Sequence, residues 1–581
     1  MAFAICLLPM LPILRLKYSY YVDWNIVNWF IAYTGEFFKH HLSFPEVFNT
    51  YQQVGDTTSF FYSTFLSWIV AIPSAFVGTN IAYRVFAIFL MFLQFFLVKN
   101  AFSLISKQKY IGWAVSTMVT WAIFPMTTLY NRSAVVEFSS AVIMHCTLAC
   151  LLTTAFHSQR RLRLLSLYCA GFLFAIAAGS HPLVGLYGSV FILLIAPGLL
   201  MVSKNRKEML KHGVSVALLI AMSLSFLIYT NHKFNKHLDV TSTLQIGFFS
   251  ENVDRLSTRF FPIAHDPRTA GSSHEQVIAD HVTAPYLDAQ INLALFIGVV
   301  FLLILIFKRK KRIKFNSNLG FGISSFVIFS FFLWASLSFT PWSFLPMIFR
   351  VAQYACRLVN YSNMALLMTL AGLLSFAAIQ EELKSKKYKI AVIICLCFSA
   401  LSLGTKLPRA NLSAVYNIFP GAFLNGPKDT ILDMSKGGPV DIWNYTTPSL
   451  YKHHVQTTAD NVVLTPIPVL TGSNFGKTDK KTFSLAEESF IQTNVHIFPW
   501  NKLFINNQLV KDEDLYSFKE IKLSVTRFFA LKLPKGEYEI KYEFMPNSLW
   551  QILRILSQLT LVVWFLGLVL LAGKELKKRA A

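Results

Sequence analysis

Residues 163–202 read RLLSLYCAGFLFAIAAGSHPLVGLYGSVFILLIAPGLLMV. The stretch contains two apolar runs separated at His181, and each run is long enough to cross a bilayer core of about 30 Å as a helix. Basic residues flank the pair on both sides, in RRLR at 160–163 and in KNRK at 204–207. A helical hairpin with both basic flanks on one side is typical of a membrane protein whose basic loops stay in the cytoplasm.

The whole chain has the same character. Of its 581 residues, 54% are hydrophobic and 14% are charged, whereas soluble domains carry about 25% charged residues. The composition therefore excludes a cytosolic enzyme, a disordered protein and a secreted disulfide scaffold. The net charge of +23 would suggest nucleic acid in a soluble chain. Here the Lys and Arg residues lie mostly in short loops between apolar runs, so we exclude nucleic acid as a partner.

The alternation of apolar runs and basic loops predicts a mainly α-helical, polytopic membrane protein of about 12 transmembrane helices. The predicted spans are the first 14 residues and the runs near 80–99, 110–129, 134–156, 163–180, 182–202, 212–230, 291–307, 318–338, 359–379, 388–405 and 549–573. Basic clusters follow every second span, at 107–109, 160–163, 204–207, 308–314, 384–389 and 574–579. This pattern predicts a cytoplasmic N-terminus.

The apolar segment 57–78 is the exception. If it crossed the membrane, the basic clusters would change sides, so we expect a helix that lies in the outer interface. Three domains then follow: a transmembrane domain over 1–405 with outer loops 15–79 and 231–290, an extracytoplasmic domain over 406–548, and a last span with a basic cytoplasmic tail over 549–581.

Strand signals dominate the predicted extracytoplasmic domain. Residues 537–544 (EYEIKYEF) alternate as a half-buried strand does, and Asn506–Asn507 between two apolar runs predicts a hairpin turn. Lys535–Gly536 predicts another turn. We therefore expect a small, largely β domain at 406–548.

Asp23 directly follows the first predicted span, in YYVDW. A carboxylate at the membrane interface can act as a general base if an acceptor hydroxyl lies beside it. The alternative is a solvated acid or an N-cap for the helix that begins near Trp24.

Arg132 and Glu137 lie at the predicted outer start of a span, in NRSAVVEF. Glu137 lies nearly one turn inside the helix, where an ionisable residue usually faces the bundle interior or a wet cavity. The alternative is a structural pair that caps the helix. A separation of five residues is a poor helical match, so each residue can have its own partner.

Arg350, Gln353 and Arg357 are spaced three and four residues apart, in MIFRVAQYACRL. This spacing puts them on one helix face, and two guanidinium groups on one face suit a phosphate. The alternative is snorkelling to lipid headgroups.

Two further polar features lie in the predicted outer loops. His181–Pro182 forms a helix junction that is either a turn or a ligand contact. The loop from Arg259 to His281 is dense in His, Asp and Glu, but its spacing matches no specific metal site. A sugar-facing loop is the preferred interpretation, and a divalent metal cofactor is left open.

Together these blocks resemble the bacterial polytopic GT-C-type glycosyltransferases, especially the YfhO-like and 6-pyruvoyl-tetrahydropterin-synthase-related membrane proteins. The resemblance is carried by the order of the acid Asp23, an aromatic helix containing Tyr62, and three later blocks. These are YNRSAVVE at 130–137, SHP at 180–182 and QYACR at 353–357. A C-terminal β domain with FPW at 498–500 and LPKG at 533–536 completes the pattern.

The resemblance implies an inverting transfer of a sugar from a polyprenyl-phosphate donor to a cell-envelope glycan or lipid acceptor, outside the bacterial plasma membrane. It implies Asp23 as the general base. Arg357, Arg132 and Arg350 would then bind the donor phosphate. Glu137, His181, Gln353 and Tyr62 would bind substrate. Two other classes stay open: a lipid or glycan transporter or flippase, and a non-catalytic envelope assembly factor.

Overall fold

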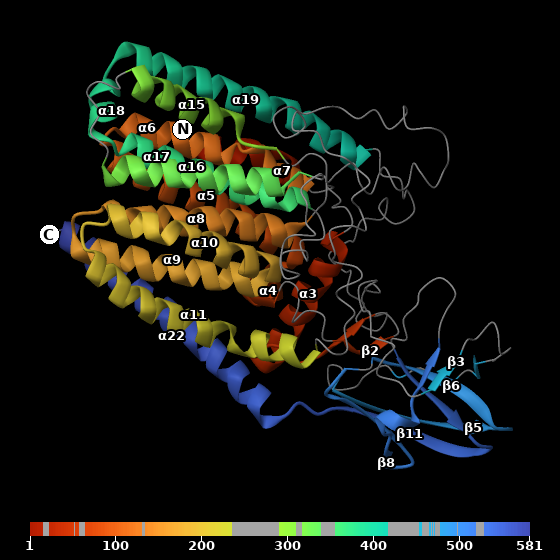
Figure 1. The fold of residues 1–581 in the computed structure, drawn as a ribbon. Coiled ribbons are helices and arrows are strands. Elements are labelled where there is room, and N and C mark those ends of the chain that lie inside the picture. Colours follow the sequence, from red (N-terminus) through yellow and green to blue (C-terminus); the bar gives the residue numbers. More distant parts are fainter. Residues whose placement is uncertain are drawn as a thin grey trace.

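A computed structural model gives the fold of the chain. It describes residues 1–14, 23–50, 53–56, 64–130, 134–234, 290–308, 316–337 and 355–415, short segments at 453–455, 464–465, 467–468 and 470, and then 477–496, 498–518 and 528–580. The described part is a bundle of long helices with a small β-rich part at one end (Figure 1). The predicted class, a mainly helical polytopic membrane protein with a small C-terminal β region, is confirmed.

Eight helices of the described part are long and apolar enough to cross a membrane. They are α5 (Thr79–Ser106), α8 (Val135–Phe156), α9 (Arg160–Ser180), α10 (Pro182–Val202), α11 (Arg206–Phe234), α16 (Ser317–Ala335), α19 (Lys386–Val415) and α22 (Ser548–Ala580). Each matches one of the predicted spans. Helix α8 lies at the centre, because the whole of its apolar window is buried inside the protein.

The other four predicted spans correspond to shorter helices. They are the N-terminal segment α1 (Ala2–Leu7), η1 (Leu8–Met10) and α2 (Leu11–Leu14), the broken pair α6 (Lys109–Thr120) and α7 (Ile123–Tyr130), α15 (Leu293–Lys308), and α17 (Val359–Leu374), which continues from η6 (Ala355–Leu358). Pro125 explains the break between α6 and α7, because a proline has no N–H and its ring clashes with the carbonyl four residues earlier, here that of Trp121.

Most of the basic clusters gather at one end of the bundle, which we call the basic end. Glu208 at the start of α11 pairs with Arg160 and Arg163 at the start of α9, and Glu575 near the end of α22 pairs with Arg161. On the other side of the bundle, the turn between α5 and α6 meets α18 (Ala377–Glu382) and the residue after it, through bonds from Gln380 and Tyr110. The C-terminus and α18 lie at this end in Figure 1.

Helices α3 (Asp23–His41) and α4 (Thr64–Val77) lie at the opposite end, which we call the site end (Figure 1). Helix α4 covers most of the segment predicted not to cross the membrane. Its 14 residues rise about 21 Å, which is shorter than a bilayer core of about 30 Å, as α15 and α17 also are. Trp68 of α4 stacks between Phe44 and Phe226, with ring centroids 4.9 and 5.5 Å away. These contacts fix α4 against α11 and the first loop.

The strands in the described part of the chain form two main sheets and one small one. The strand order of the first sheet is β1 (Phe48–Thr50), β2 (Gln53–Asp56), β6 (Ser489–His496), β10 (Phe528–Leu533), and β4 (Leu464–Thr465) also pairs with β6. The strand order of the second sheet is β5 (Thr478–Leu485), β11 (Gly536–Phe544), β7 (Asn501–Ile505), β8 (Gln508–Leu509). In the small sheet, β3 (His453–Val455) pairs with β9 (Tyr516–Phe518). The predicted Asn506–Asn507 turn joins β7 to β8, and both residues have positive φ, 50° and 63°. Asn tolerates this left-handed backbone better than most residues.

The first loop contributes strands to the C-terminal β-rich part. Val54 of β2 pairs in parallel with Val495 of β6, and β1 pairs with β2. The strand patterns in the sequence predict strands only after residue 406. The β-rich part therefore also includes β1 and β2, which follow α3 in the first loop.

Aromatic side chains join the β-rich part to the bundle. Phe234 at the end of α11 lies 5.1 Å from Phe498 and 5.0 Å from Trp500 between ring centroids. Trp500 also packs on Trp550 of α22, whose indole N–H donates to Thr230 Oγ1 at 2.8 Å. The motif FPW at 498–500 thus forms part of the joint between sheet and membrane helices.

An ion pair holds the first loop on α22. The buried Arg554 of α22 bonds to Glu46 Oε1 at 2.9 Å and to the Phe44 carbonyl, and Lys477 Nζ lies 3.1 Å from Glu46 Oε2. We expect Glu46→Gln to destabilise the protein by about 3–5 kcal/mol, because it leaves a buried guanidinium without its carboxylate. Thermal unfolding of the purified protein measures this effect.

Glu488→Gln is the matched control. Glu488 pairs with Lys532 at 2.5 Å, but both side chains are largely exposed, and such pairs contribute about 0–1 kcal/mol. Equal melting temperatures for the Glu46 and Glu488 variants would contradict the assigned role of Glu46.

Candidate functional site

The structure brings two of the predicted site residues together at the site end. Arg357 Nε lies 3.4 Å from Glu137 Oε2, and their side chains are 15% and 7% exposed. The two residues are 220 positions apart in the chain. Glu137 therefore has a partner on η6, and the paired side chains are nearly enclosed by the bundle.

Local structure supports both charges. Glu137 lies in the first turn of α8, where a carboxylate is stabilised by the positive end of the helix dipole. Arg357 lies in η6, just before the first turn of α17. A cation there is unfavourable by the same dipole argument, so Arg357 needs an anion beside it. Glu137 supplies one, and the end of α17 remains an electropositive location.

His181 lies at the same end of the bundle. It is 4% exposed and forms the N-cap of α10, with Pro182 at the first helical position. Ser140 Oγ of α8 contacts the Ala177 carbonyl of α9 at 3.5 Å, and the His181 N–H donates to the same carbonyl at 3.0 Å. His181 lies about one helical turn closer to the site end than Ala177, and Glu137 lies about one turn closer to that end than Ser140. His181 and Glu137 therefore lie at a similar level of the bundle.

The other predicted residues are described less fully. Asp23 is the first residue of α3, but its side chain lies outside the described set. Four predicted residues lie wholly outside the described residues: Arg132, Arg350, Gln353 and Tyr62. The same holds for the loop from Arg259 to His281. Within the described ranges, no group of three His, Cys, Asp or Glu side chains could hold a metal ion.

Helix α3 lies between the bundle and the β-rich part. It packs against α4, α5 and α8 on the bundle side. On its other side Trp29, Phe30 and Tyr33 enclose Phe48 of β1, with ring centroids 5.0–6.1 Å apart. The helix that begins at Asp23 therefore reaches both the helix that carries Glu137 and the sheet.

Three buried polar residues were not among the predicted site residues. Arg84 of α5 is 9% exposed, and its neighbour Tyr83 bonds to the Val135 carbonyl at the start of α8. Gln290 is 1% exposed and Asn360 is 5% exposed. Among the described residues, no hydrogen-bond partner is found for Arg84 Nε, for either side-chain atom of Gln290, or for Asn360 Oδ1.

A hydrogen-bonded network lies at the same end of α17 and includes the backbone of Gln290. The Gln290 carbonyl accepts from Asn363 Nδ2 at 3.1 Å, and the Asn363 side-chain oxygen accepts from the Asn292 N–H at 2.7 Å. Asn360 lies three residues after Arg357 and three before Asn363, so the three share one helical face. Polar residues at the start of an apolar run are the signal that could have found this set.

A buried tyrosine pair in the same region gives a pH-dependent prediction. Tyr542 of β11 donates to Asn501 Oδ1 at 3.0 Å. Burial and the neighbouring Tyr33 raise the pKa of Tyr542 well above its usual value, and burial raises the pKa of Tyr33. In the unfolded chain both phenols ionise near pH 10. Above that pH the folded state holds more protons, so its stability must fall as pH rises.

We expect Tyr542→Phe to reduce this loss of stability. For one tyrosine the fall is up to about 1.4 kcal/mol per pH unit between pH 10 and its folded pKa. Thermal unfolding at pH 9 and pH 11 measures it. Tyr538→Phe, four residues earlier on the same face of the strand but only partly buried, is the control. An unchanged pH response in the Tyr542 variant would contradict the prediction.

Comparison with known proteins gives distant structural similarity. No protein-family model matches the chain, and no curated protein sequence matches it. Two solved structures, both of ArnT from Cupriavidus metallidurans, match at 14% identity. The structure bound to undecaprenyl phosphate has a TM-score of 0.35, and the match covers 69% of this chain and 63% of that one. The apo structure has a TM-score of 0.29, with 64% and 76% covered.

The matched region thus spans less than two thirds of the ArnT structure with bound undecaprenyl phosphate. No residue of this chain takes its role from these similarities. The candidate site rests on the geometry at the site end: a buried carboxylate–guanidinium pair, a buried histidine and a network of buried amides.

Proposed function

We propose that this protein is a glycosyltransferase of the GT-C type, which transfers a sugar from a polyprenyl-phosphate donor to a cell-envelope glycan or lipid acceptor. The observation that carries the proposal is the buried Arg357–Glu137 pair, with its 3.4 Å contact, at the end of the bundle opposite the basic end. Basic loops face the cytoplasm, so the pair would face the extracytoplasmic side of a bacterial plasma membrane.

The proposed reaction is an inverting displacement. The acceptor hydroxyl attacks the anomeric carbon, and the bond from that carbon to the phosphate oxygen breaks. The polyprenyl phosphate leaves with the bonding electron pair. Asp23 takes the hydroxyl proton as general base. Because the sugar–phosphate bond of the donor is already activated, no nucleotide site is needed.

Arg357 would stabilise the negative charge that grows on the leaving phosphate, together with Arg132 and Arg350. The proposal is supported by the position of Arg357 at the positive end of α17, where an anion is favoured. Glu137 would hold the guanidinium in place. His181, Gln353 and Tyr62 would contact the substrate.

A transporter or flippase predicts ionisable groups that serve a pathway near the centre of the bilayer. His145, midway along α8, is buried at such a depth. Its Nδ1 contacts the Ala141 carbonyl of its own helix at 2.9 Å, which is a structural role. The charged residues considered above lie near helix ends, and this favours chemistry at the membrane surface.

The direct test is transfer in proteoliposomes. The purified protein would be supplied with a panel of polyprenyl-phosphate sugars and extracted envelope glycolipids, with and without a chelator. The expected result is release of free polyprenyl phosphate with one donor of the panel, and the chelator arm determines the metal requirement. Movement of intact donor across the bilayer without any cleavage would favour a flippase and overturn the proposal.

A further inference from the structure

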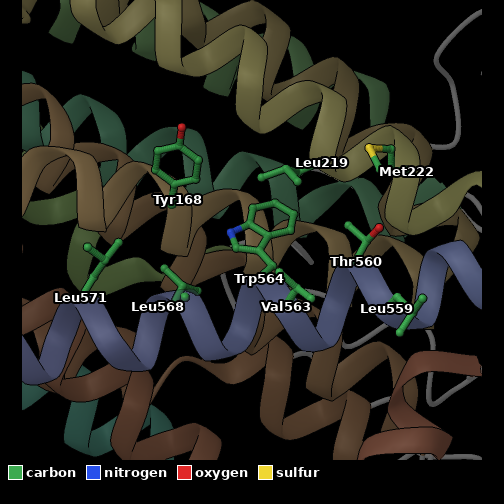
Figure 2. A pocket seen from close by; sticks show the side chains of 10 residues that line it. Tyr168, Leu219, Met222, Leu559, Thr560, Val563, Trp564, Leu568 and Leu571 are labelled. Carbon is green, nitrogen blue, oxygen red and sulfur yellow. The ribbon is translucent and has the colours of Figure 1, made fainter.

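A groove unrelated to the candidate site runs along the surface of α9, α11 and α22 (Figure 2). It has a volume of about 420 Å³, and its lining is almost entirely apolar. Trp564 forms the floor and is 6% exposed, whereas Leu559 and Val563 on the rim are 57% and 66% exposed. The groove is therefore open to the hydrocarbon of the membrane.

The floor of the groove is fixed by close packing. A Cβ atom added to Gly171 of α9 would lie 3.1 Å from the Trp564 ring and 2.2 Å from Val216 Cγ1. Only a glycine lets α9 approach the indole this closely, as small residues do at helix contacts in membranes. The Trp564 side chain is thus held in place beneath the groove, and the hollow above it is a stable part of the surface.

The length of the groove matches one leaflet. Its lining on α22 runs from Leu559 to Leu571, a separation of twelve residues that rises about 18 Å. Half of a bilayer core of about 30 Å is about 15 Å. An acyl chain of ordinary length can therefore lie along the whole groove, whereas a long polyprenyl chain exceeds it.

The groove ends at the basic end of the bundle. Lys574 and Glu575 follow Leu571 by three and four residues on the same helix face, and Glu575 lies 3.7 Å from Arg161 of α9. Tyr168, which lines the groove, bonds through its hydroxyl to His212 Nδ1 at 3.1 Å. A tyrosine with a polar contact at a groove end is typical of the headgroup level.

The charges around this end are strongly cationic. Three arginines lie in 160–163, four Lys or Arg residues in 204–211 and two lysines in 574–577, against two carboxylates, Glu208 and Glu575. Both carboxylates are already engaged by arginines of 160–163. The lysines therefore leave a surplus of positive charge beside the open end of an apolar groove.

We propose that this groove binds an anionic diacyl phospholipid of the leaflet at the basic end. One acyl chain lies over Trp564, and the phosphate lies beside Lys574 and Lys577. Basic pockets beside transmembrane helices recognise acidic headgroups in this way. The site is separate from the Arg357–Glu137 pair, and the inference does not depend on the proposed function.

The test uses the full chain in nanodiscs of equal parts phosphatidylglycerol and phosphatidylcholine, with native mass spectrometry of the released lipid complexes. The wild type is expected to retain phosphatidylglycerol over phosphatidylcholine by about fivefold or more. Lys574→Gln with Lys577→Gln should remove most of this preference. Equal retention of the two lipids by the wild type would overturn the proposal.

Two glycines of α22 provide a matched pair of variants. A Cβ atom at Gly567 or at Gly573 meets nothing within 4 Å, so a side chain can leave the backbone at either position without a clash at its Cβ. Only Gly567 lines the groove. Gly567→Phe should therefore abolish retention of phosphatidylglycerol, and Gly573→Phe should leave it unchanged. Equal loss in both variants would overturn the proposal.

Two additional experiments test whether something other than a phospholipid occupies the groove. If undecaprenyl phosphate displaces phosphatidylglycerol from the wild type but does not bind the Gly567→Phe variant, the groove belongs to the polyprenyl lipid. If the wild type is a dimer and Gly567→Phe makes it a monomer, the groove is an interface between copies. Either result would overturn the phospholipid assignment.

Discussion

An Asp23→Asn variant is expected to lose sugar transfer by a factor of about 10² to 10⁴, the usual contribution of a positioned general base. The amide has nearly the shape of the carboxylate but cannot accept the proton of the acceptor hydroxyl. Insertion into the membrane and the melting temperature should not change, because Asp23 lies at the first turn of α3 and Asn is also a good residue at a helix start. The measurement is release of polyprenyl phosphate from the donor in proteoliposomes.

Glu36→Gln is the control for this prediction. Glu36 lies on the same helix, is 43% exposed and pairs with His40 at 2.9 Å. It should keep full activity. Wild-type activity in the Asp23 variant would remove the base assignment, whereas loss of activity in both variants would indicate that α3 tolerates no change of charge.

The second large effect concerns the buried ion pair. Arg357→Met should destabilise the protein by about 3–5 kcal/mol, because it leaves the Glu137 carboxylate buried without its guanidinium. Arg357→Met combined with Glu137→Gln removes both charges, so most of the stability should return. Transfer should stay at least about 100-fold below wild type in both proteins, because the phosphate loses a cation in the transition state. Thermal unfolding and the transfer assay measure the two effects separately.

The Arg163–Glu208 pair at the basic end is the matched control. Its side chains are both 11% exposed and lie 2.6 Å apart, but Glu208 keeps Arg160 as a second partner, so Arg163→Met should produce a smaller loss of stability. Activity per folded molecule should not fall. If the double Arg357 and Glu137 variant regains both stability and activity, the pair is purely structural and the assignment of Arg357 fails.

The sequence predicts the bundle well because membrane spans depend on local composition. The eight long helices follow the predicted runs, because about 20 apolar residues with basic flanks form few stable structures other than a membrane-spanning helix. The break between α6 and α7 was missed because hydropathy does not register the position of Pro125. The strands β1 and β2 were missed because three or four polar and apolar residues give no reliable alternation, and their partner lies far along the chain.

The candidate site was predictable only residue by residue. Glu137 and Arg357 stand out as charges inside apolar sequence, but nothing local indicates that residues 220 positions apart pair with each other. Arg84 was passed over because one arginine near the end of a long apolar run resembles a snorkelling residue. Its burial depends on the packing of other helices around it, which is a tertiary effect.

The pairing of Val54 with Val495 has a consequence for how the protein is made. The two residues are 441 positions apart, and ribosomes add about 5–20 residues per second. Strand β2 therefore waits about 20–90 s for its partner while most of the helices enter the membrane. During that time its open edge can pair with other chains. The polar Gln53 and the charged Asp56 of β2 reduce this risk, because polar and charged side chains make the unpaired strand less prone to aggregate.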